Sequence, residues 1–361
     1  MSEPQVAPPA SKAPGRLPSS NGWTALVLIA SLIVLAALVP VPYVVLAPGP
    51  VTDTLGSVNK QPLITITGRR TYPTEGRLDL TTVSVSGGPQ SPLQLGRAVT
   101  AWFDRRYAVV PESLVYPPDA DEQEVEEQNA QEMTDSQQQA TSAALRSLRI
   151  PVSTSVVVQT TIEGLPARGV LEAGDVIRSV NGAPVAAAQV LRERIRPLPV
   201  GSTVKLGIVR DGRPTTLTLR TAADPDDDTR SAVGVATREE HDYPFDVAIK
   251  LDDVGGPSAG LMFALGIVDK LTPGALTGGR HIAGTGAIDG DGSVRRIGGI
   301  QQKVRAASEE GASVFLTPAA NCPNARAVRP AGLRLIEVEK LSDAVASLEA
   351  LRTGKGDVPE C

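Results

Sequence analysis

Two residues with reactive side chains stand in glycine-rich surroundings in the last third of the chain, Ser258 in GGPSAG and Lys303 in GGIQQK. A serine hydroxyl is a weak nucleophile until a base takes its proton, and lysine becomes such a base only where burial lowers its pKa. Pro257 suits a first helical turn, and the apolar run from Leu261 to Val268 predicts a helix behind it. The N–H groups at that helix start would stabilise an oxyanion. The pair therefore predicts acyl transfer by a serine nucleophile.

Other bases and ordinary structural roles compete with this interpretation. A serine at a helix start is often only a cap, and a helical lysine is usually exposed. Histidine is the commoner partner of a catalytic serine, and the chain has two, His241 and His281. A Ser-His-Asp triad using His281 stays open at this point, although no flanking motif supports it.

The segment GGPSAG, followed by AGTGAIDGDGSVRRIGGIQQKVRAASEEGA, closely resembles the Lon proteolytic domain; the resemblance runs over roughly residues 240–350, and a Lon-like domain is predicted over 230–350. The resemblance implies that Ser258 is the nucleophile and that Lys303 is its base. It also implies that the hydroxyl of Thr285 orients the lysine. Many Lon domains carry Asp three residues before the serine, whereas this chain has Gly255, with Asp252 and Asp253 nearby. The loop before Ser258 is therefore expected to differ from the family.

Residues 150–223 read as short strands joined by tight turns, with Asn181-Gly182 and Asp211-Gly212 as hairpin signals. Within them, GLPARGVLEAGDVIRSVNGAPV resembles the core of a PDZ domain of the bacterial protease-associated kind. Such domains bind extended peptide tails by adding a strand to a sheet edge. No carboxylate-binding loop is identified in the sequence, so a PDZ-shaped spacer with a degenerate groove remains an alternative.

The N-terminal part predicts a membrane anchor. Residues 1–22 are rich in Pro, Ser and Ala and are expected to form a disordered cytoplasmic tail. Residues 23–47 carry no charge and are expected to form a single transmembrane helix. Lys12 and Arg16 before it favour a cytoplasmic N-terminus, which places the rest of the chain outside the cytoplasm. The alternative is a cleaved signal peptide that ends near Ala47.

The remaining segments complete an α+β multidomain prediction. Residues 51–149 read as a small β-rich segment, then an acidic linker over 119–135, then a helix from Ala140 to Arg149. Residues 224–228 form a charged hinge, and residues 351–361 a C-terminal tail. In order, the chain is predicted to contain a transmembrane helix, a β-rich segment, a PDZ domain (a β-sandwich with helices) and a Lon-type α/β domain. This order resembles the YlbL-like PDZ–Lon membrane proteases.

The amino-acid composition argues against several classes of binding partner and cofactor. The net charge of −5 offers no basic surface for a phosphate backbone, so nucleic acid is not expected to bind. Two Cys and two His do not make a zinc site, and no cofactor or metal is expected. No Gly-x4-Gly-Lys-Ser/Thr loop occurs, so the chain is not expected to hydrolyse ATP. The expected partners are protein or peptide substrates and a membrane, and homo-oligomer formation is left open.

The two cysteines predict a disulfide between Cys322 and Cys361. Both lie beyond the membrane segment, where thiols oxidise, and their even number leaves no thiol over.

Two functions follow from these observations. The first is an ATP-independent, membrane-anchored serine endopeptidase with a Ser258–Lys303 dyad. The second is a peptide-binding adaptor in which the PDZ domain recruits partners and the Lon-like domain is structural. Retention of Ser258, Lys303 and Thr285 together favours the first.

Overall fold

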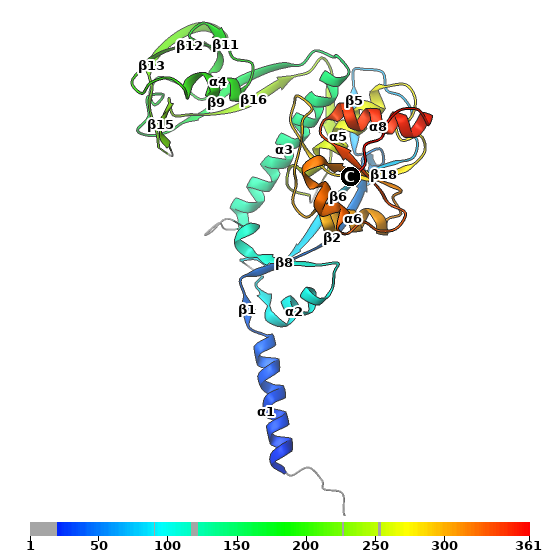
Figure 1. The fold of residues 1–361 in the computed structure, drawn as a ribbon. Helices are drawn as coiled ribbons and strands as arrows, with labels where there is room; N and C mark the ends of the chain where they lie inside the picture. Colours follow the sequence, from blue (N-terminus) through cyan, green and yellow to red (C-terminus); the bar gives the residue numbers. More distant parts are fainter. Residues whose placement is uncertain (1–19, 90, 117–121, 226, 252–253) are drawn as a thin grey trace, which may run out of the picture. The chain divides into compact units, whose positions relative to one another are not determined.

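The computed structural model describes residues 20–89, 91–116, 122–225, 227–251 and 254–361 (Figure 1). These residues form two compact units. The first comprises the described parts of 1–49 and 83–126, and the second comprises 50–82 and 127–361. The predicted tail charges Lys12 and Arg16, and the acidic pair Asp252 and Asp253, lie outside the described residues.

The first unit begins with helix α1 (Ser20–Ala37), whose large apolar side chains are all more than half exposed. Within the described residues, no helix is both long enough and apolar enough to cross a membrane. The predicted helix over 23–47 is wrong in its last part, because α1 ends at Ala37 and Pro40 begins a strand. Prolines 40 and 42 lack the N–H that a continuing helix would need.

Short strands and one amphipathic helix make up the rest of this unit. Strand β1 pairs with β7, and the first half of β2 pairs with β8, both antiparallel. The elements are β1 (Pro40–Val41), β2 (Tyr43–Asp53), β7 (Leu93–Gln94), α2 (Leu95–Phe103) and β8 (Ala108–Pro111).

The second unit contains a sheet in which four parallel strands lie in the order β22-β21-β18-β6. Side chains alternate along these strands, as a sheet covered on both faces requires. Ile282 and Leu316 enter one apolar core, and Ala283 and Phe315 enter another on the opposite face. The strands are β6 (Arg77–Ser86), β18 (His281–Gly284), β21 (Val314–Pro318) and β22 (Arg334–Val338).

Helices cover both faces of this sheet. Buried residues of α3, α5 and α8 pack on the face that carries Ile282, and those of α6 and α7 pack on the face that carries Ala283. The helices are α3 (Glu122–Ser147), α5 (Gly260–Leu271), α6 (Ile300–Glu309), α7 (Cys322–Arg326) and α8 (Leu341–Thr353).

The proteolytic domain predicted over 230–350 is incomplete without earlier residues. Strand β5 (Ile64–Thr67) pairs antiparallel with β17 (Asp246–Ile249), and β6 pairs parallel with β18. Both β5 and β6 fall in the segment that was predicted to be a separate β-rich region. That boundary is therefore wrong, because pairing between strands about two hundred residues apart leaves no local pattern in the sequence.

Helix α3 also differs from the prediction. It starts at Glu122, inside the expected acidic linker over 119–135, rather than at Ala140. The early acidic positions Glu124, Glu126 and Glu127 are exposed, as an acidic helix face should be. Met133 is buried, however, and so is Ser136 just after the acidic segment, so the helix packs against the proteolytic domain from the end of that segment onward.

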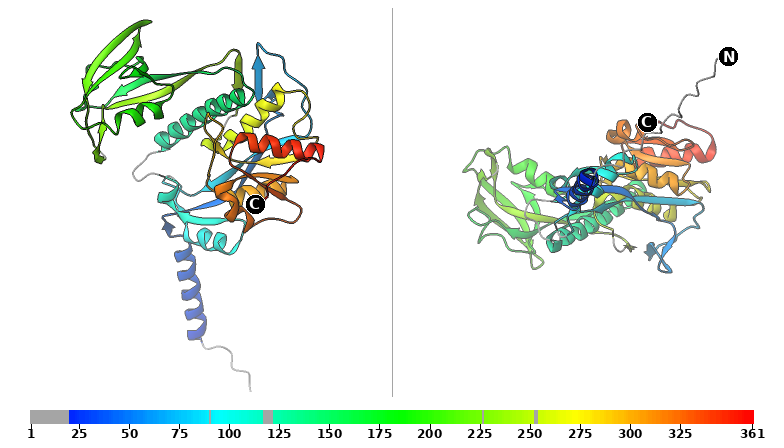
Figure 2. Two further views of the ribbon diagram at one scale, coloured as in Figure 1. Left: turned by 45° about the horizontal axis from the view of Figure 1, so that its top comes forward. Right: turned by 90° about the horizontal axis from the view of Figure 1, so that it is seen from below.

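The strands drawn in green in Figures 1 and 2 form a separate sheet with the order β13-β12-β10-β9-β16 and carry the short helix α4. Asn181 and Asp211 have φ of 50° and 51°, as the two predicted hairpin turns require. Strand β16 extends this sheet to Asp242, so the predicted end at 223 is too early. The elements are β9 (Ser153–Thr161), β10 (Val176–Val180), α4 (Ala188–Ile195), β12 (Thr203–Arg210), β13 (Arg213–Arg220) and β16 (Val235–Asp242).

The predicted disulfide between Cys322 and Cys361 is confirmed, with the two Cα atoms 5.1 Å apart. Cys322 begins α7, and the backbone N–H of Cys361 donates to the carbonyl of Leu335 in β22 at 3.2 Å. The last residues of the chain therefore run beside the outer parallel strand.

Candidate active site

Ser258 lies in a 3₁₀ turn (Pro257–Ala259) that continues directly into α5. Pro257 occupies the first helical position, where a missing N–H costs nothing. Gly256 precedes it with φ of 85°, a conformation that favours glycine. Helix α5 is buried from Gly260 to Asp269, which fixes the turn in place. The first N–H groups of a helix have no intrahelical acceptor, so this turn can offer donors to an anion.

Lys303 reaches this serine from α6. The helix begins after Gly299, which has φ of 65°, and its apolar residues Ile300 and Val304 hold it against the sheet. Lys303 is 3% exposed, and its Nζ lies 2.6 Å from Oγ of Ser258. Burial lowers the pKa of the Lys303 amine from 10.5 to about 7, because a low-dielectric surrounding disfavours the charged form. A large fraction of the amine is therefore neutral near pH 7.

Thr285 completes the polar group of the site. It follows β18 directly and is fully buried. Its hydroxyl donates to the carbonyl of Ser258 at 3.0 Å, and its oxygen accepts from Nζ of Lys303 at 3.1 Å. Because its single proton is committed to the carbonyl, Thr285 can only accept from the lysine. This arrangement fixes the amine next to the serine.

The backbone after Thr285 ties the strand to the serine turn. The N–H of Gly286 donates to the carbonyl of Ser258 at 2.8 Å, and the N–H of Leu261 donates to the carbonyl of Gly286 at 3.0 Å. A Cβ on Gly286 would lie 2.8 Å from Val294, so the close approach requires glycine. The structure thus brings together Ser258, Lys303 and Thr285, all three of the residues singled out from the sequence.

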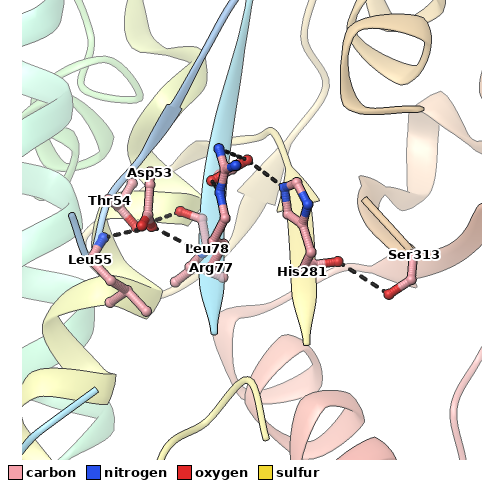
Figure 3. Close-up of polar contacts among 8 residues, drawn as sticks. Asp53, Thr54, Leu55, Arg77, Leu78, His281 and Ser313 are labelled. Atoms are coloured by element: carbon pink, nitrogen blue, oxygen red, sulfur yellow. Dashed lines mark hydrogen bonds and ion pairs between the residues drawn. The ribbon is translucent and has the colours of Figure 1, made fainter. Parts of the chain in front are cut away.

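His281 does not join this group. It begins β18, whereas Thr285 follows its end, and four residues of strand separate their Cα atoms by about 13 Å. Its Nε2 lies 2.6 Å from the buried carboxylate of Asp79, which also pairs with Arg77 at 2.9 Å. Figure 3 shows Arg77 and His281 on neighbouring strands, β6 and β18. The geometry gives no support to a triad of Ser258 with His281.

The other contacts in Figure 3 are structural. One carboxylate oxygen of Asp53 accepts from the N–H groups of Leu55 and Leu78, and the hydroxyl of Thr54 donates to the carbonyl of Leu78. These hydrogen bonds connect the turn that follows β2 to strand β6. The second histidine, His241, lies in β16 and its Nδ1 is 3.1 Å from the hydroxyl of Thr154.

A second candidate site, which the sequence reasoning missed, is a groove of about 570 Å³ between α4 and strand β16. Its apolar lining includes Leu191 and Ile195 of α4, and Val235 of β16. Among the described residues, strand β16 pairs with β9 on one side only and is the last strand in the sheet order. Its other edge can therefore accept an added strand.

The lining of this groove also includes polar groups. Ser231 lies 1% exposed before β16, and its hydroxyl has no hydrogen-bond partner among the described residues. Arg192 of α4 and Arg196, which follows the end of α4, line the same groove. A buried hydroxyl without a partner is costly unless a ligand or water satisfies it. The sequence signal was the apolar stretch Val233-Gly234-Val235, in which Gly234 has φ of 76°.

Two family models match the chain. Residues 126–221 match the PDZ domain, and residues 248–349 match the C-terminal proteolytic domain of Lon protease (S16). The chain thus contains a PDZ domain and a Lon-type serine-protease domain. The structural limits of both extend beyond the matched residues, to β16 for the first and to β5 and β6 for the second.

Curated relatives match over short stretches. The periplasmic serine endoprotease DegP of Salmonella typhimurium is 42% identical over 53 residues, which are 15% of this chain and 11% of that protein. A Lon protease of Roseiflexus castenholzii is 41% identical over 71 residues, 20% of this chain and 9% of that protein. The chain therefore spans about a tenth of the length of each.

Solved structures match one part of the chain. The PDZ domain of an SdrC-like protein from Listeria innocua is 26% identical and covers 23% of this chain and 93% of its own, with a TM-score of 0.22.

Proposed function

We propose that this chain is an ATP-independent serine endopeptidase in which Ser258 is the nucleophile and Lys303 its general base. The observation that carries the proposal is the 2.6 Å separation between Oγ of Ser258 and Nζ of a buried lysine with a pKa of about 7. A base with a pKa near the working pH is the one that moves protons most effectively. The absence of a phosphate-binding loop from the sequence supports independence from ATP.

The reaction follows from the three side chains. Neutral Lys303 takes the proton of Ser258 as Oγ attacks the carbonyl carbon of a peptide bond. N–H groups of the turn that begins at Pro257 stabilise the resulting oxyanion. The Lys303 ammonium then gives its proton to the leaving amine as the C–N bond breaks. Water, deprotonated by the same lysine, cleaves the acyl-enzyme and returns the hydroxyl of Ser258.

We assign Thr285 a positioning role in these steps. Its hydroxyl bonds the carbonyl of Ser258 and accepts from Lys303, so it keeps the amine near Oγ in both protonation states. A base that is already held within hydrogen-bond distance of the proton it accepts does not lose conformational entropy in each turnover.

The PDZ groove is proposed to bind the C-terminal tail of a substrate or partner protein. The tail would add to the free edge of β16 and place an apolar final residue between Ile195 and Val235. The hydroxyl of Ser231 and the N–H groups beside Gly234 would meet the terminal carboxylate. Arg192 and Arg196 favour acidic character in the tail.

The chain is further proposed to be attached to a membrane by α1, with its proteolytic domain outside the cytoplasm. The large apolar side chains of α1 from Trp23 to Leu35 are between 59% and 71% exposed, which suits a lipid environment better than water. The disulfide between Cys322 and Cys361 supports an oxidising compartment.

The test is proteolysis by the full-length chain in detergent, with unfolded casein as the substrate. Wild type should cleave without ATP, and Ser258→Ala should not. Lys303→Arg should also be inactive, because arginine keeps the charge but does not deprotonate. If Ser258→Ala cleaves as fast as wild type, the activity does not belong to this site. If wild type binds peptides through the PDZ groove but cleaves nothing, the adaptor function is favoured instead.

A further inference from the structure

Helix α3, which lies outside the Lon-type match, touches the loop that carries the nucleophile at two points. The hydroxyl of Ser136, in a residue only 4% exposed, donates to the carbonyl of Pro257 at 3.0 Å. The N–H of Gly256 is directed at the carbonyl of Asn129 at 3.4 Å. Asn129 and Ser136 are two helical turns apart and so lie on one face of the helix. This face runs along the segment immediately before Ser258.

The close approach of α3 accounts for glycine at position 255. A Cβ on Gly255 would lie 2.7 Å from the Cβ of Asn129, closer than real side chains come. Many Lon domains carry aspartate at this place, three residues before the serine. Here the helix occupies the space beside the loop, and a larger residue at 255 would displace it.

A neighbouring face of α3 forms hydrogen bonds with the segment that follows Thr285. The N–H of Gly290 donates to the side-chain oxygen of Gln139 at 2.6 Å, and Arg146 donates to the carbonyl of Gly290 at 2.7 Å. Gly290 closely follows Thr285 and Gly286, which bond the carbonyl of Ser258. Helix α3 therefore forms hydrogen bonds with both segments that meet at Ser258, the loop before Ser258 and the segment after Thr285.

We propose that α3 is a working part of the active site and that Ser136 is a positioning residue for Ser258. The carbonyl of Pro257 belongs to the same planar peptide group as the N–H of Ser258. By holding that carbonyl, Ser136 fixes the direction of the N–H and of the backbone that carries Oγ. The inference rests on the proposed protease function, which it deepens by adding a positioning element from outside the residues that match the Lon-type domain.

The first test compares Ser136→Ala with Thr134→Ala in the full-length protein. Thr134 is exposed on the same helix, and its hydroxyl donates to the carbonyl of Ala130 at 3.0 Å. Ser136→Ala should lower kcat for a fluorogenic peptide roughly 10- to 100-fold, because a loosened oxyanion donor costs rate rather than binding. KM and the midpoint of the pH profile should stay within twofold and 0.3 units of wild type, about the precision of such measurements. Wild-type kcat in Ser136→Ala would overturn the proposal.

The second test uses the close contact between the loop and the helix. Gly255→Ala should lower kcat like Ser136→Ala, and adding Asn129→Gly should restore it by removing the opposing Cβ. Rescue of this kind is a direct measure of coupling between the two positions. An unchanged kcat in Gly255→Ala, or a loss that Asn129→Gly does not relieve, would contradict the inference.

Hydrogen exchange separates this inference from the proposed function. In Ser136→Ala, amides of residues 256–260 should exchange faster than in wild type and in Thr134→Ala, whether or not the chain cleaves peptides. If wild type is inactive and exchange still rises, the proposed function fails while the contact stands. Unchanged exchange would show that α3 does not hold the loop.

Discussion

At the scale of the residue, Lys303 determines what the site can do. A lysine in water stays protonated far above neutral pH and cannot accept a proton from serine. Here burial lowers its pKa to about 7, and its Nζ lies between the hydroxyls of Ser258 and Thr285. The amine is thus shielded from water yet keeps two hydrogen-bond partners, which a buried amine needs.

Activity should rise with pH through the pKa of Lys303. The neutral amine is the active form, and its fraction increases as pH passes about 7. The expected profile of kcat/KM climbs about tenfold per unit below the pKa and flattens above it. Initial rates on a peptide substrate between pH 5.5 and 9 check this, with circular dichroism as the control for folding. A rate that falls steadily over that range would exclude a lysine base.

Lys303→Met should abolish proteolysis and stabilise the protein. The amine is neutral when folded and charged when unfolded between about pH 7 and 10.5, so folding releases a proton there. The unfolded chain binds more protons, and wild-type stability therefore rises with pH in this window. Near pH 7 the free energy of unfolding should increase by roughly 2–4 kcal/mol in the variant.

Urea unfolding of the two proteins at several pH values measures this difference. The gap between them should narrow as pH rises from about 7 toward 10, because the cost of neutralising the lysine disappears. A gap that stays constant with pH would mean that the amine is not buried in its neutral form.

At the scale of the element, the PDZ groove depends on two neighbours, helix α4 and edge strand β16. The sheet fixes β16 through its pairing with β9, and the buried residues Leu191 and Ile195 fix α4. Ser231 lines this groove, and its buried hydroxyl has no hydrogen-bond partner among the described residues. Burial of this unsatisfied hydroxyl lowers the free energy of unfolding, and a ligand that forms a hydrogen bond with it would offset that loss.

Ser231→Ala should weaken peptide binding without lowering the folding stability of the protein. Loss of one hydrogen bond to a peptide carboxylate weakens binding about 3- to 10-fold, while removal of an unsatisfied hydroxyl leaves folding stability unchanged or slightly higher. Fluorescence anisotropy with a C-terminal peptide selected on the wild-type chain gives the Kd, and thermal unfolding gives the stability. Thr215→Ala, at an exposed position of β13, is the matched control. Equal affinity in wild type and Ser231→Ala would remove the serine from the ligand site.

At the scale of the whole molecule, the second unit is built from two stretches of sequence. Strand β6 lies beside β18 in the parallel sheet, and β5 pairs with β17. The chain then leaves this unit between Thr82 and Glu127 and returns through α3. The proteolytic domain thus encloses the PDZ domain in sequence.

A fragment of residues 230–361 should fail to fold cooperatively, although it contains Ser258, Thr285 and Lys303. Without β6 the strand β18 loses its parallel neighbour and exposes an unpaired edge, and without α3 the core around α5 is uncovered. Residues 50–361 should unfold in a cooperative transition. Near-ultraviolet circular dichroism and thermal unfolding of both fragments decide the matter. A cooperative transition in the shorter fragment would mean that the domain is continuous after all.

The sequence alone determined those features that depend on residues close together in the chain. Glycine-rich motifs placed Ser258 and Lys303, the apolar run after Pro257 predicted α5, and Asn181-Gly182 and Asp211-Gly212 marked real hairpins. These signals are local because turns and helix starts depend on residues within a few positions of each other. The pairing of Cys322 with Cys361 followed from their place beyond the predicted membrane segment and from their number, since two cysteines allow one bridge.

The tertiary structure decided everything that joins distant segments. Only the fold shows that β6 borders β18, that Ser136 reaches the carbonyl of Pro257, and that His281 faces Asp79 instead of Ser258. It also ended α1 at Ala37, where the apolar pattern alone predicted a helix to residue 47. Contacts between residues far apart depend on packing and chain crossing, which composition and periodicity do not record. The lysine acquires its pKa of about 7 only when those contacts bury it.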